Sequence, residues 1–535
     1  MRNLSLNIQT FSQLIEGDCI YIDKTEIIHR LIKQSKTCFF SRPRRFGKSL
    51  VVSTLESIFR GKKELFENLA ISKTDYDWKE YPIVKLDFGT LAYENPDQLK
   101  FSLCLQLKLI AQEYGIEDNF DYLTEPSNFI AVLFPKLARN NKIVFLVDEY
   151  DKPILDHIEN MPVAHAIRDV LQKFYSSIKG NDQYIHFMFV TGVSKFSQTA
   201  LFSGFNNLDD LSQHPKAAEL VGYTKQEIER YFTEYLDWTA KSMGYTHEEL
   251  MNQISQWYDG YRFTLETEFE MSAYEKKTIQ KIYSPVSVMK FLDRRRFSNY
   301  WFETGTPTYL VKAMRSGIHD TSWIDCFTSI KVDPSMFGSF NLERIPFDAL
   351  LYQAGYLTIK SYDEENKLVE LAYPNLELKN SMESYLLSAK CDMSETRVAP
   401  VIAQLRVGLK AGDIEPLANA FKILLANVPY QLHIEQEGYY HSIFQTALWI
   451  LGSDVQSEVC TDTGRADLVV RTNDRIFVFE FKFNKPAQEA MDQILEKRYY
   501  EKYQHESKPI LLVGLSFNYK AKKLTVEYLT QAMNF

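Results

Sequence analysis

The stretch that decides the fold of the N-terminal part is Thr37-Cys-Phe-Phe-Ser-Arg-Pro-Arg-Arg-Phe-Gly-Lys-Ser49. It starts as a short β-prone run, passes through a turn with a proline, and leads into apolar residues compatible with a helix. The Walker A pattern requires Gly, four residues and then Gly-Lys-Ser or Gly-Lys-Thr. Gly47, Lys48 and Ser49 satisfy its second half, whereas Arg42 occupies the first glycine position.

Each of the matching residues has a chemical reason to be there. Gly47 lets the backbone approach phosphate oxygens, Lys48 reaches the β- and γ-phosphates, and Ser49 binds Mg²⁺ at the positive end of the following helix. The alternative is a basic surface turn, because a lone Gly-Lys-Ser occurs often by chance. The context along the chain has to decide between the two.

A second acidic motif follows about a hundred residues later. The continuous apolar run 143–147 is typical of a buried strand and ends in Asp148-Glu149. In a Walker B element, Asp148 holds Mg²⁺ through water and Glu149 polarises the attacking water. The alternative is a strand that ends in a solvated acidic turn.

Two further apolar runs, 83–88 and 184–190, also predict strands, and the second ends in Thr191. The carboxyl ends of parallel strands line one edge of a sheet. We therefore expect Lys48, Asp148 and Thr191 to converge, with Thr191 as a polar sensor of the γ-phosphate. The pairing of Gly-Lys-Ser with a distant Asp-Glu at a strand end predicts an α/β nucleotide-binding domain.

At this point the residues carry a family resemblance. The stretches 21–25, 41–49 and 147–153 resemble the AAA-ATPase-like family of prokaryotes, whose own loop has the form Ser-Arg-Pro-Arg-Arg-Phe-Gly-Lys-Ser. Further similar stretches are Trp257-Tyr-Asp-Gly-Tyr-Arg-Phe263, Tyr283-Ser-Pro-Val-Ser287, Thr304-Gly-Thr-Pro307 and Leu351-Tyr-Gln-Ala-Gly-Tyr-Leu357. The resemblance reaches residue 375 and implies binding of ATP with Mg²⁺. From the residues alone, the stretches 257–263 and 304–307 are interpreted as turns packed on a core.

The arginines of this region are candidates for charge stabilisation. Arg44, Arg45 and Arg262 each qualify, and no spacing rule selects among them. We include Arg45 with Gly47, Lys48, Ser49, Asp148 and Thr191 in the expected set of cofactor contacts.

Length and composition set the frame for these motifs. The 535 residues are 45% hydrophobic and 24% charged, which is typical of a folded multidomain protein. The net charge of −9 excludes a chain-wide basic surface for nucleic acid, although residues 1–60 carry ten basic against five acidic side chains. The six cysteines are scattered, and no run reaches membrane-spanning length or resembles a signal peptide. We expect a cytoplasmic protein without a membrane partner.

Three domains are expected: an ATPase-like domain at 1–265, a mostly helical linker domain at 266–425 and a smaller α/β domain at 426–535. Helical spacing of apolar residues, as in Glu415–Ala426, supports the middle assignment. The charged tract Glu266–Lys277 is interpreted as a solvated loop.

The C-terminal part contains a second group of carboxylates. Asp467 opens one predicted strand, and a second strand over 476–483 carries Glu480 and Lys482. Residues i and i+2 share one face of a strand, so Glu480 and Lys482 point the same way while the neighbouring phenylalanines pack opposite. Charged side chains in such an apolar hairpin favour a site in which Asp467 and Glu480 bind Mg²⁺ and Lys482 orients a water. The alternative is an ordinary charged hairpin.

This Asp, twelve residues, Glu-x-Lys pattern resembles the PD-(D/E)XK nuclease superfamily, although no proline precedes Asp467. The resemblance implies a restriction-endonuclease-like fold and a further acid from an upstream helix. For that acid we favour Glu437, with Glu435 and Glu458 as alternatives. It also implies a helix, expected over 488–503, that carries Gln493 and Tyr500 near the site.

These features predict an ATP-binding and ATP-hydrolysing protein with a Mg²⁺-dependent nuclease domain. Its catalytic residues would be Glu149, Asp467, Glu480 and Lys482. Its binding partner would be a nucleic acid, and we favour DNA. Residues 431–535 carry 12 basic and 14 acidic side chains, which favours as an alternative a nucleotide-gated interaction protein whose nuclease-like domain is inactive. A degenerate ATPase half is a third hypothesis, and a homo-oligomer or a protein partner stays open.

Overall fold

The computed structural model describes residues 1–117, 120, 123–195, 201–202, 208–272, 275–305, 330–338, 346–390, 393–426, 443–444, 447–448, 454–461, 464–472, 474–506, 508–520 and 523–533. The described chain divides into two compact units. The first holds the described residues up to Leu378 and the second those from Lys379 onward. The three-domain division at residues 265 and 425 stays a prediction.

The first unit is built on a sheet of five parallel strands in the order β2-β3-β4-β1-β5. The strands are β1 (Thr37–Ser41), β2 (Ile83–Asp87), β3 (Ile143–Asp148), β4 (Ile185–Gly192) and β5 (Asp209–Asp210). Every residue of β1 and β3 is buried, as expected when helices cover both faces of a parallel sheet. The α/β fold and the strands expected from the three apolar runs are thereby confirmed.

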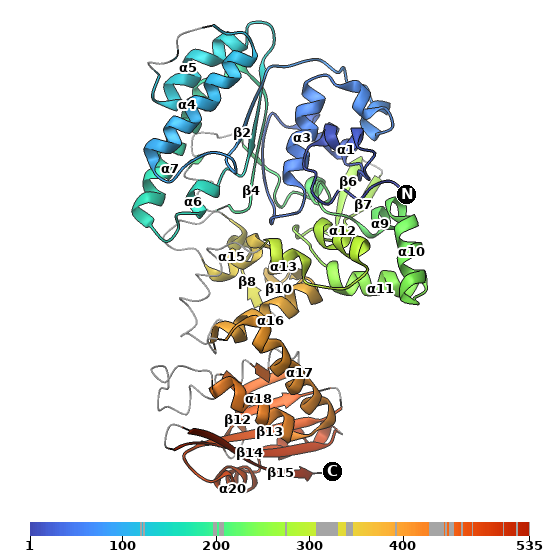
Figure 1. Ribbon diagram of the computed structural model, residues 1–535, viewed down its shortest axis with the longest axis vertical. Coiled ribbons are helices and arrows are strands. Elements are labelled where there is room, and N and C mark those ends of the chain that lie inside the picture. Colours follow the sequence, from blue (N-terminus) through green and yellow to red (C-terminus); the bar gives the residue numbers. More distant parts are fainter. Residues whose placement is uncertain are drawn as a thin grey trace. The chain divides into compact units, whose positions relative to one another are not determined.

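Helices connect these strands and pack on the sheet. Figure 1 shows α4, α5 and α7 on one side of the sheet and α3 on the other. The helices of this part are α1 (Phe11–Glu16), α2 (Thr25–Gln34), α3 (Lys48–Phe59), α4 (Pro96–Glu113), α5 (Pro126–Leu137), α6 (Lys152–Leu155) and α7 (Met161–Gly180). Because β1 leads directly into α3, the loop between them lies at the carboxyl edge of the sheet.

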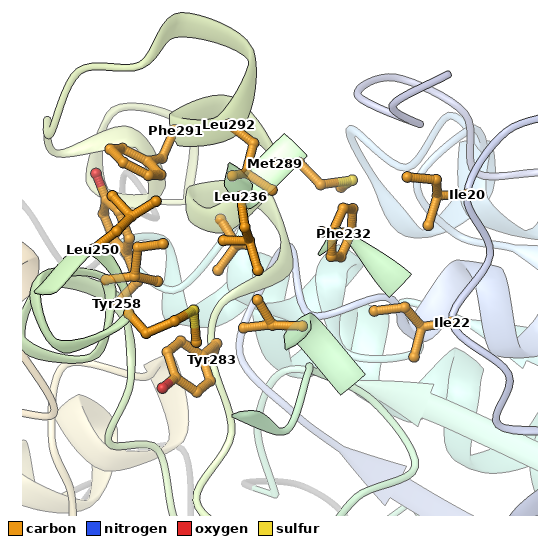
Figure 2. Packing of buried hydrophobic residues seen from close by; sticks show 14 of the residues in the cluster. Ile20, Ile22, Phe232, Leu236, Leu250, Tyr258, Tyr283, Met289, Phe291 and Leu292 are labelled. Atoms are coloured by element: carbon orange, nitrogen blue, oxygen red, sulfur yellow. The ribbon is translucent and has the colours of Figure 1, made fainter. Parts of the chain in front are cut away.

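A helical layer follows the parallel sheet in the sequence. Its helices are α9 (Lys225–Tyr231), α10 (Thr233–Met243), α11 (His247–Tyr258), α12 (Pro285–Arg294), α13 (Tyr300–Gly305) and α15 (Phe347–Ala354). Phe232, Leu236 and Met289 belong to its apolar core, and Figure 2 shows Ile20 and Ile22 of the N-terminal chain facing Phe232 and Met289. Ile20 and Ile22 thus pack the N-terminal segment against the helical layer.

The tract Glu266–Lys277 contains two paired antiparallel strands, so the expectation of a loop was wrong, although residues 266–268, 270 and 276 are exposed as expected. Its strands are β6 (Glu268–Ser272) and β7 (Glu275–Thr278). The antiparallel register places Glu270 opposite Lys276, so that opposite charges meet across the strands. Reading the tract as solvated charges missed this cross-strand pairing.

The region 330–372 adds a small antiparallel sheet to the helices expected there. Its strands β8 (Ile330–Val332), β10 (Leu368–Ala372) and β9 (Thr358–Asp363) pair in this order. Helix α16 (Leu376–Lys390) follows and continues from the first unit into the second.

The second unit consists of helices on a mixed five-stranded sheet in the order β11-β12-β13-β14-β15. Its elements are α17 (Glu395–Ala411), α18 (Ile414–Ala426), β11 (Asp454–Thr461), β12 (Gly464–Arg471), β13 (Ile476–Phe483), α20 (Ala487–Lys497), β14 (Ile510–Lys520) and β15 (Lys523–Met533). β13 and β14 are parallel because α20 crosses between them, and the other pairs are antiparallel. No helix within the described ranges is long and apolar enough to cross a membrane.

Candidate functional site

The loop between β1 and α3 has the backbone geometry of an anion-binding loop. Gly47 is the N-cap of α3 with φ 102°, a left-handed conformation that glycine adopts without strain. Arg45 also has a positive φ of 66°, although it is not glycine, and its side chain is exposed. Such strained residues cluster at functional sites.

The ammonium group of Lys48 is buried inside this loop. Its Nζ donates to the carbonyl oxygens of Arg42 at 2.9 Å and Pro43 at 3.0 Å. Burial lowers the pKa of Lys48, and the carboxylates of Asp148 and Glu149 oppose that change. The lysine therefore lies between the loop and the acidic end of β3.

The acidic residues at the end of β3 meet the start of α3. The Ser49 hydroxyl donates to the Asp148 carboxylate. Burial raises the pKa of Asp148, although this hydrogen bond lowers it. Glu149 follows with a positive φ of 54°, and burial raises the pKa of its carboxyl group. A Cβ added to Gly89 would lie 2.6 Å from a Glu149 carboxylate oxygen, so glycine leaves the room that Glu149 occupies.

Thr191, at the end of β4, is fully buried, and its Oγ1 has no hydrogen-bond partner among the residues that the structure describes. The strand register pairs it with Phe40 of β1, next to the phosphate-binding loop. Asp151 holds the adjacent chain, because its carboxylate accepts from the backbone N–H groups of Val193 and Ser194. A buried hydroxyl without a partner is an uncommon feature that fits contact with a polar ligand.

A cavity of about 490 Å³ is lined by Lys48, Ser49 and Glu149, whereas the buried Asp148 and Thr191 are not part of its lining. Its polar end is formed by Arg44, Lys48, Ser49 and Glu149. Its less polar part is lined by residues from the N-terminal segment and α12, including Leu6, Ile8, Ile20, Ile22, Val286 and Met289. A cavity with one charged and one apolar end matches the two halves of a nucleotide.

Arg42, which replaces the first Walker A glycine, is buried rather than aimed at the cavity. Its guanidinium donates to the carbonyl oxygens of Ser41 and Ser212 and lies over the rings of Phe40 and Phe263, 4.5 and 4.4 Å from their centroids. Burial lowers the pKa of this guanidinium to about 10. Sequence reasoning found no role for this residue, and the structure shows that it ties the loop to two distant segments.

The second carboxylate group lies on β12 and β13. Lys482 Nζ donates to Glu480 Oε1 at 3.0 Å, which confirms that the two side chains share a face. Asp467 lies in the middle of β12 rather than at its start, and its carboxylate accepts from the backbone N–H of Phe481 at 2.8 Å. Burial and then the nearby Asp467 raise the pKa of Glu480 to about 7.

This group fits part of a hard-cation site. Glu480 is 1% exposed, and within the described part of the chain its Oε2 has no hydrogen-bond partner. Mg²⁺ is commonly held by one or two carboxylates with water completing its shell. Over the described ranges no three His, Cys, Asp or Glu side chains gather to hold a metal, and Glu437 and Glu435 lie outside those ranges. Nothing is described of the side chain of Glu458.

The helix expected over 488–503 is interrupted. α20 ends at Lys497, Arg498 adopts a positive φ of 49°, and a 3₁₀ helix runs from Tyr499 to Glu506. The turn places Tyr499 on Gln493, whose amide donates to the Tyr499 hydroxyl at 3.2 Å. Burial raises the pKa of Tyr499, and Glu480 and Asp467 raise it further. The Gln493 amide therefore contacts Tyr499, the residue before the expected Tyr500.

Comparison with known proteins agrees with both groups of residues. The family model described as "Predicted AAA-ATPase" matches residues 5–202, and that of the PD-(D/E)XK nuclease superfamily matches residues 435–527. A protein of Azotobacter chroococcum mcd 1, described as "Uncharacterized protein in vnfD 5'region", is 34% identical over 534 residues, which cover 97% of this chain and 96% of the relative. The chain belongs to the AAA-ATPase-like family. It combines the ATPase-like domain with a C-terminal PD-(D/E)XK nuclease superfamily domain.

The other stretches that resemble the AAA-ATPase-like family pack around its phosphate-binding loop. Tyr261 and Phe263 contact the ring of Phe46. Gly355 has φ 92°, and a Cβ there would lie 2.7 Å from Pro43. This fits the interpretation of 259–263 as a packed turn, whereas residues 257–258 end helix α11 and the stretch 304–307 extends beyond the described residues. Residues 285–287 and 351–354 belong to helices α12 and α15.

Among the candidate arginines, Arg262 hydrogen-bonds to backbone carbonyl groups. Its guanidinium donates to the carbonyl oxygens of Thr264 and Leu265. Arg44 and Arg45 both line the cavity, so the choice of a charge-stabilising arginine narrows to these two within the described chain.

Proposed function

We propose that the first unit binds and hydrolyses ATP with Mg²⁺. The observation that carries this proposal is that Lys48, Ser49 and Glu149 line one cavity while Asp148 is hydrogen-bonded to Ser49 directly behind them. Bound Mg²⁺ would neutralise phosphate charge and favour displacement at the γ-phosphate. Ser49 and Asp148 would hold that ion.

The remaining steps belong to side chains of the chain itself. Lys48 exchanges the loop carbonyls for phosphate oxygens, and the backbone at Gly47 approaches them closely. Glu149 orients a water and accepts its proton, a role that suits a carboxyl group whose pKa is raised by burial. The Thr191 hydroxyl donates to the γ-phosphate side, and Arg45 adds positive charge at the mouth.

ATP binding is tested by thermal unfolding with and without ATP and Mg²⁺. A ligand at a hundred times its Kd stabilises the folded state by about 2.7 kcal/mol. We expect this stabilisation in the wild type and in Lys62→Ala, which alters an exposed lysine, and its loss in Lys48→Ala. An equal shift in Lys48→Ala would contradict the proposed phosphate site, and hydrolysis is measured separately as phosphate release, which Glu149→Gln should abolish.

For the second unit we propose Mg²⁺-dependent cleavage of nucleic acid, DNA by preference. Asp467 and Glu480 would hold the ion, and Lys482 would orient the attacking water and stabilise charge on the phosphate. The support is a buried carboxylate oxygen that no described residue hydrogen-bonds, next to a second carboxylate and a lysine. ATP state at the first unit would control this activity.

The decisive assay incubates the full chain with plasmid or oligonucleotide DNA, Mg²⁺ and ATP. Wild type and Lys485→Ala, an exposed lysine three positions away, should cleave, whereas Lys482→Ala should not. Equal inactivity of wild type and Lys482→Ala would favour the second candidate, a nucleotide-gated interaction protein with an inactive nuclease-like domain. The net charge of −2 over residues 431–535 favours that candidate. Mg²⁺ titration separates the two, because a docking domain does not require the ion at Asp467 and Glu480.

A further inference from the structure

A buried carboxyl group, outside the catalytic set, connects two walls of the nucleotide cavity. Glu377, in the first turn of α16, is 0% exposed. It accepts a hydrogen bond from the backbone N–H of Trp301 and contacts Ser287 Oγ at 2.7 Å. A buried carboxyl group needs such partners, because transfer from water without them is costly.

The protonation of Glu377 follows from its surroundings. Burial raises its pKa to about 8, so the carboxyl group is mostly protonated at pH 7. Ser287 Oγ also contacts Ser284 Oγ at 3.0 Å, and a hydroxyl has one hydrogen to donate. A protonated Glu377 donates to Ser287, which then donates to Ser284, the N-cap of α12, whereas a charged Glu377 accepts from Ser287.

On one side, this network reaches the phosphate-binding loop. Trp301, which is 0% exposed, donates from its indole Nε1 to the carbonyl oxygen of Arg44 at 2.9 Å. Glu377 holds the backbone of the same tryptophan. The loop that carries Arg44, Gly47 and Lys48 is therefore held by the indole of Trp301, whose backbone is hydrogen-bonded to Glu377.

On the other side, the network reaches the apolar end of the cavity. Ser284 and Ser287 lie in the first turn of α12, and Pro285, Val286 and Met289 of the same helix line the cavity. A shift of this turn therefore moves the apolar wall. Glu377 thus links the wall behind the phosphates with the wall at the opposite end.

We propose that Glu377 is a positioning residue for the nucleotide cavity, which sets the spacing between the phosphate-binding loop through Trp301 and α12 through Ser287. The inference rests on the ATP binding proposed above. It adds a residue that touches neither phosphate nor water, and that lies outside every motif used to recognise the site. Its effect should be on substrate binding, because Lys48, Ser49, Asp148 and Glu149 have their own contacts.

The test measures the steady-state ATPase rate against ATP concentration in the full chain. Glu377→Leu introduces an apolar side chain of similar size and removes both hydrogen bonds. We expect its KM for ATP to rise about tenfold, while kcat stays within about threefold of wild type. Glu377→Gln retains an acceptor for Trp301 and a donor for Ser287, and its KM should stay within about twofold. Glu364→Leu makes the same change in an exposed turn and should leave both constants unchanged.

Two further variants keep the test decisive if Glu377→Leu does not fold. Trp301→Phe preserves a ring and removes the indole N–H, and Ser287→Ala removes the link to α12, so each should raise KM about threefold to tenfold. Trp257→Phe makes the matched change at a ring that stacks on Phe297, in the core of the helical layer, and should leave KM unchanged.

The possible failures are distinguishable. A wild type that neither binds nor hydrolyses ATP overturns the proposed function. The positioning role alone is overturned if the wild type hydrolyses ATP and three variants keep its KM, with kcat reduced only in proportion to their folded fraction. These variants are Glu377→Leu, Trp301→Phe and Ser287→Ala. A Glu377→Gln variant as impaired as Glu377→Leu would also contradict it, because the donor and acceptor pattern would then not matter.

Discussion

At the scale of single residues, Glu480 shows how a site differs from a core position. Its carboxyl group is buried beside Asp467, and one of its oxygens has no hydrogen-bond partner in the described ranges. An apolar or neutral residue would be more stable at this place, which is why the position indicates function.

A pH-dependent stability difference follows from this carboxyl group. Its pKa is raised in the folded state from 4.5 to about 7, so in the absence of metal its contribution is fully present below pH 4.5 and is lost as pH rises through 7. At pH 8, Glu480→Gln should raise the free energy of opening of β13 by about 1–3 kcal/mol and flatten its pH dependence. Amide hydrogen exchange of β13 across this pH range measures the effect.

The exposed Glu489 provides the matched control, since Glu489→Gln should leave the exchange of β13 unchanged. Adding Mg²⁺ should stabilise the wild type and not Glu480→Gln. A destabilised Glu480→Gln protein at pH 8 without metal would show that the carboxylate has a structural role.

Arg42 is the second residue whose role is set by its surroundings. Arg42→Gly restores the general Walker A pattern, yet it removes donors from buried carbonyls and the contacts with Phe40 and Phe263. We expect a loss of about 3 kcal/mol from the stability of the first unit, with weaker ATP binding. Chemical denaturation measures the loss, and Arg139→Gly, at an exposed position, serves as the control. A stable Arg42→Gly protein with wild-type ATP affinity would contradict this role.

At the scale of elements, the packing of α20 on its sheet depends on one glycine. A Cβ at Gly514 of β14 would lie 2.8 Å from the Met491 backbone nitrogen and 2.9 Å from the Ala487 carbonyl oxygen. Because both atoms are backbone, the whole helix has to move, and with it Gln493.

Gly514→Ala should therefore destabilise the second unit by about 1–3 kcal/mol and weaken the contact between Gln493 and Tyr499. Thermal unfolding reports the first effect and the environment of Tyr499 in NMR spectra the second. Gly180→Ala is the control, since a Cβ at Gly180, the last residue of α7, meets nothing within 4 Å. Unchanged stability in Gly514→Ala would mean that α20 adjusts freely.

At the scale of the whole molecule, α16 is the described segment through which the nucleotide site can reach the second unit. It carries Glu377 in its first turn and continues past Lys379. We expect ATP to slow amide hydrogen exchange in α16 on both sides of this boundary, by about threefold or more, because ordering the cavity walls orders Glu377. Lys48→Ala should abolish the effect, and Lys62→Ala should keep it. Protection that stops at Leu378 would show that the two units respond separately.

Charge at the same scale limits how nucleic acid is held. The net charge is −9 for the whole chain and −2 for residues 431–535. We therefore expect basic side chains to contact only a few phosphates of a bound nucleic acid. The slope of log Kobs against log salt, which is about −0.9 per phosphate contact, should be shallower than about −3. The measurement uses Lys482→Ala with Ca²⁺ and duplex DNA, so that cleavage does not interfere. A slope beyond about −6 would reveal a basic surface that the segment charges do not show.

The sequence by itself determined the ATPase-like sheet, its phosphate-binding loop, the acidic strand end and the Glu-x-Lys strand. These features are local: a strand is a short apolar run, a helix repeats every 3.6 residues, and a motif places its side chains within one turn. The same local reasoning missed the β6-β7 hairpin and extended α20 beyond Lys497, because cross-strand pairing and the positive φ of Arg498 are not contained in periodicity.

Only the tertiary structure decided the roles of Arg42, Tyr499 and Glu377. The indole of Trp301 reaches a carbonyl 257 positions away in the chain, and Glu377 reaches Trp301 across 76. No spacing rule connects residues so far apart, because which of them meet depends on how the helices pack on the sheet. Burial then changes their chemistry, since the same carboxyl group that is charged in water is mostly neutral at pH 7 in the interior of the protein.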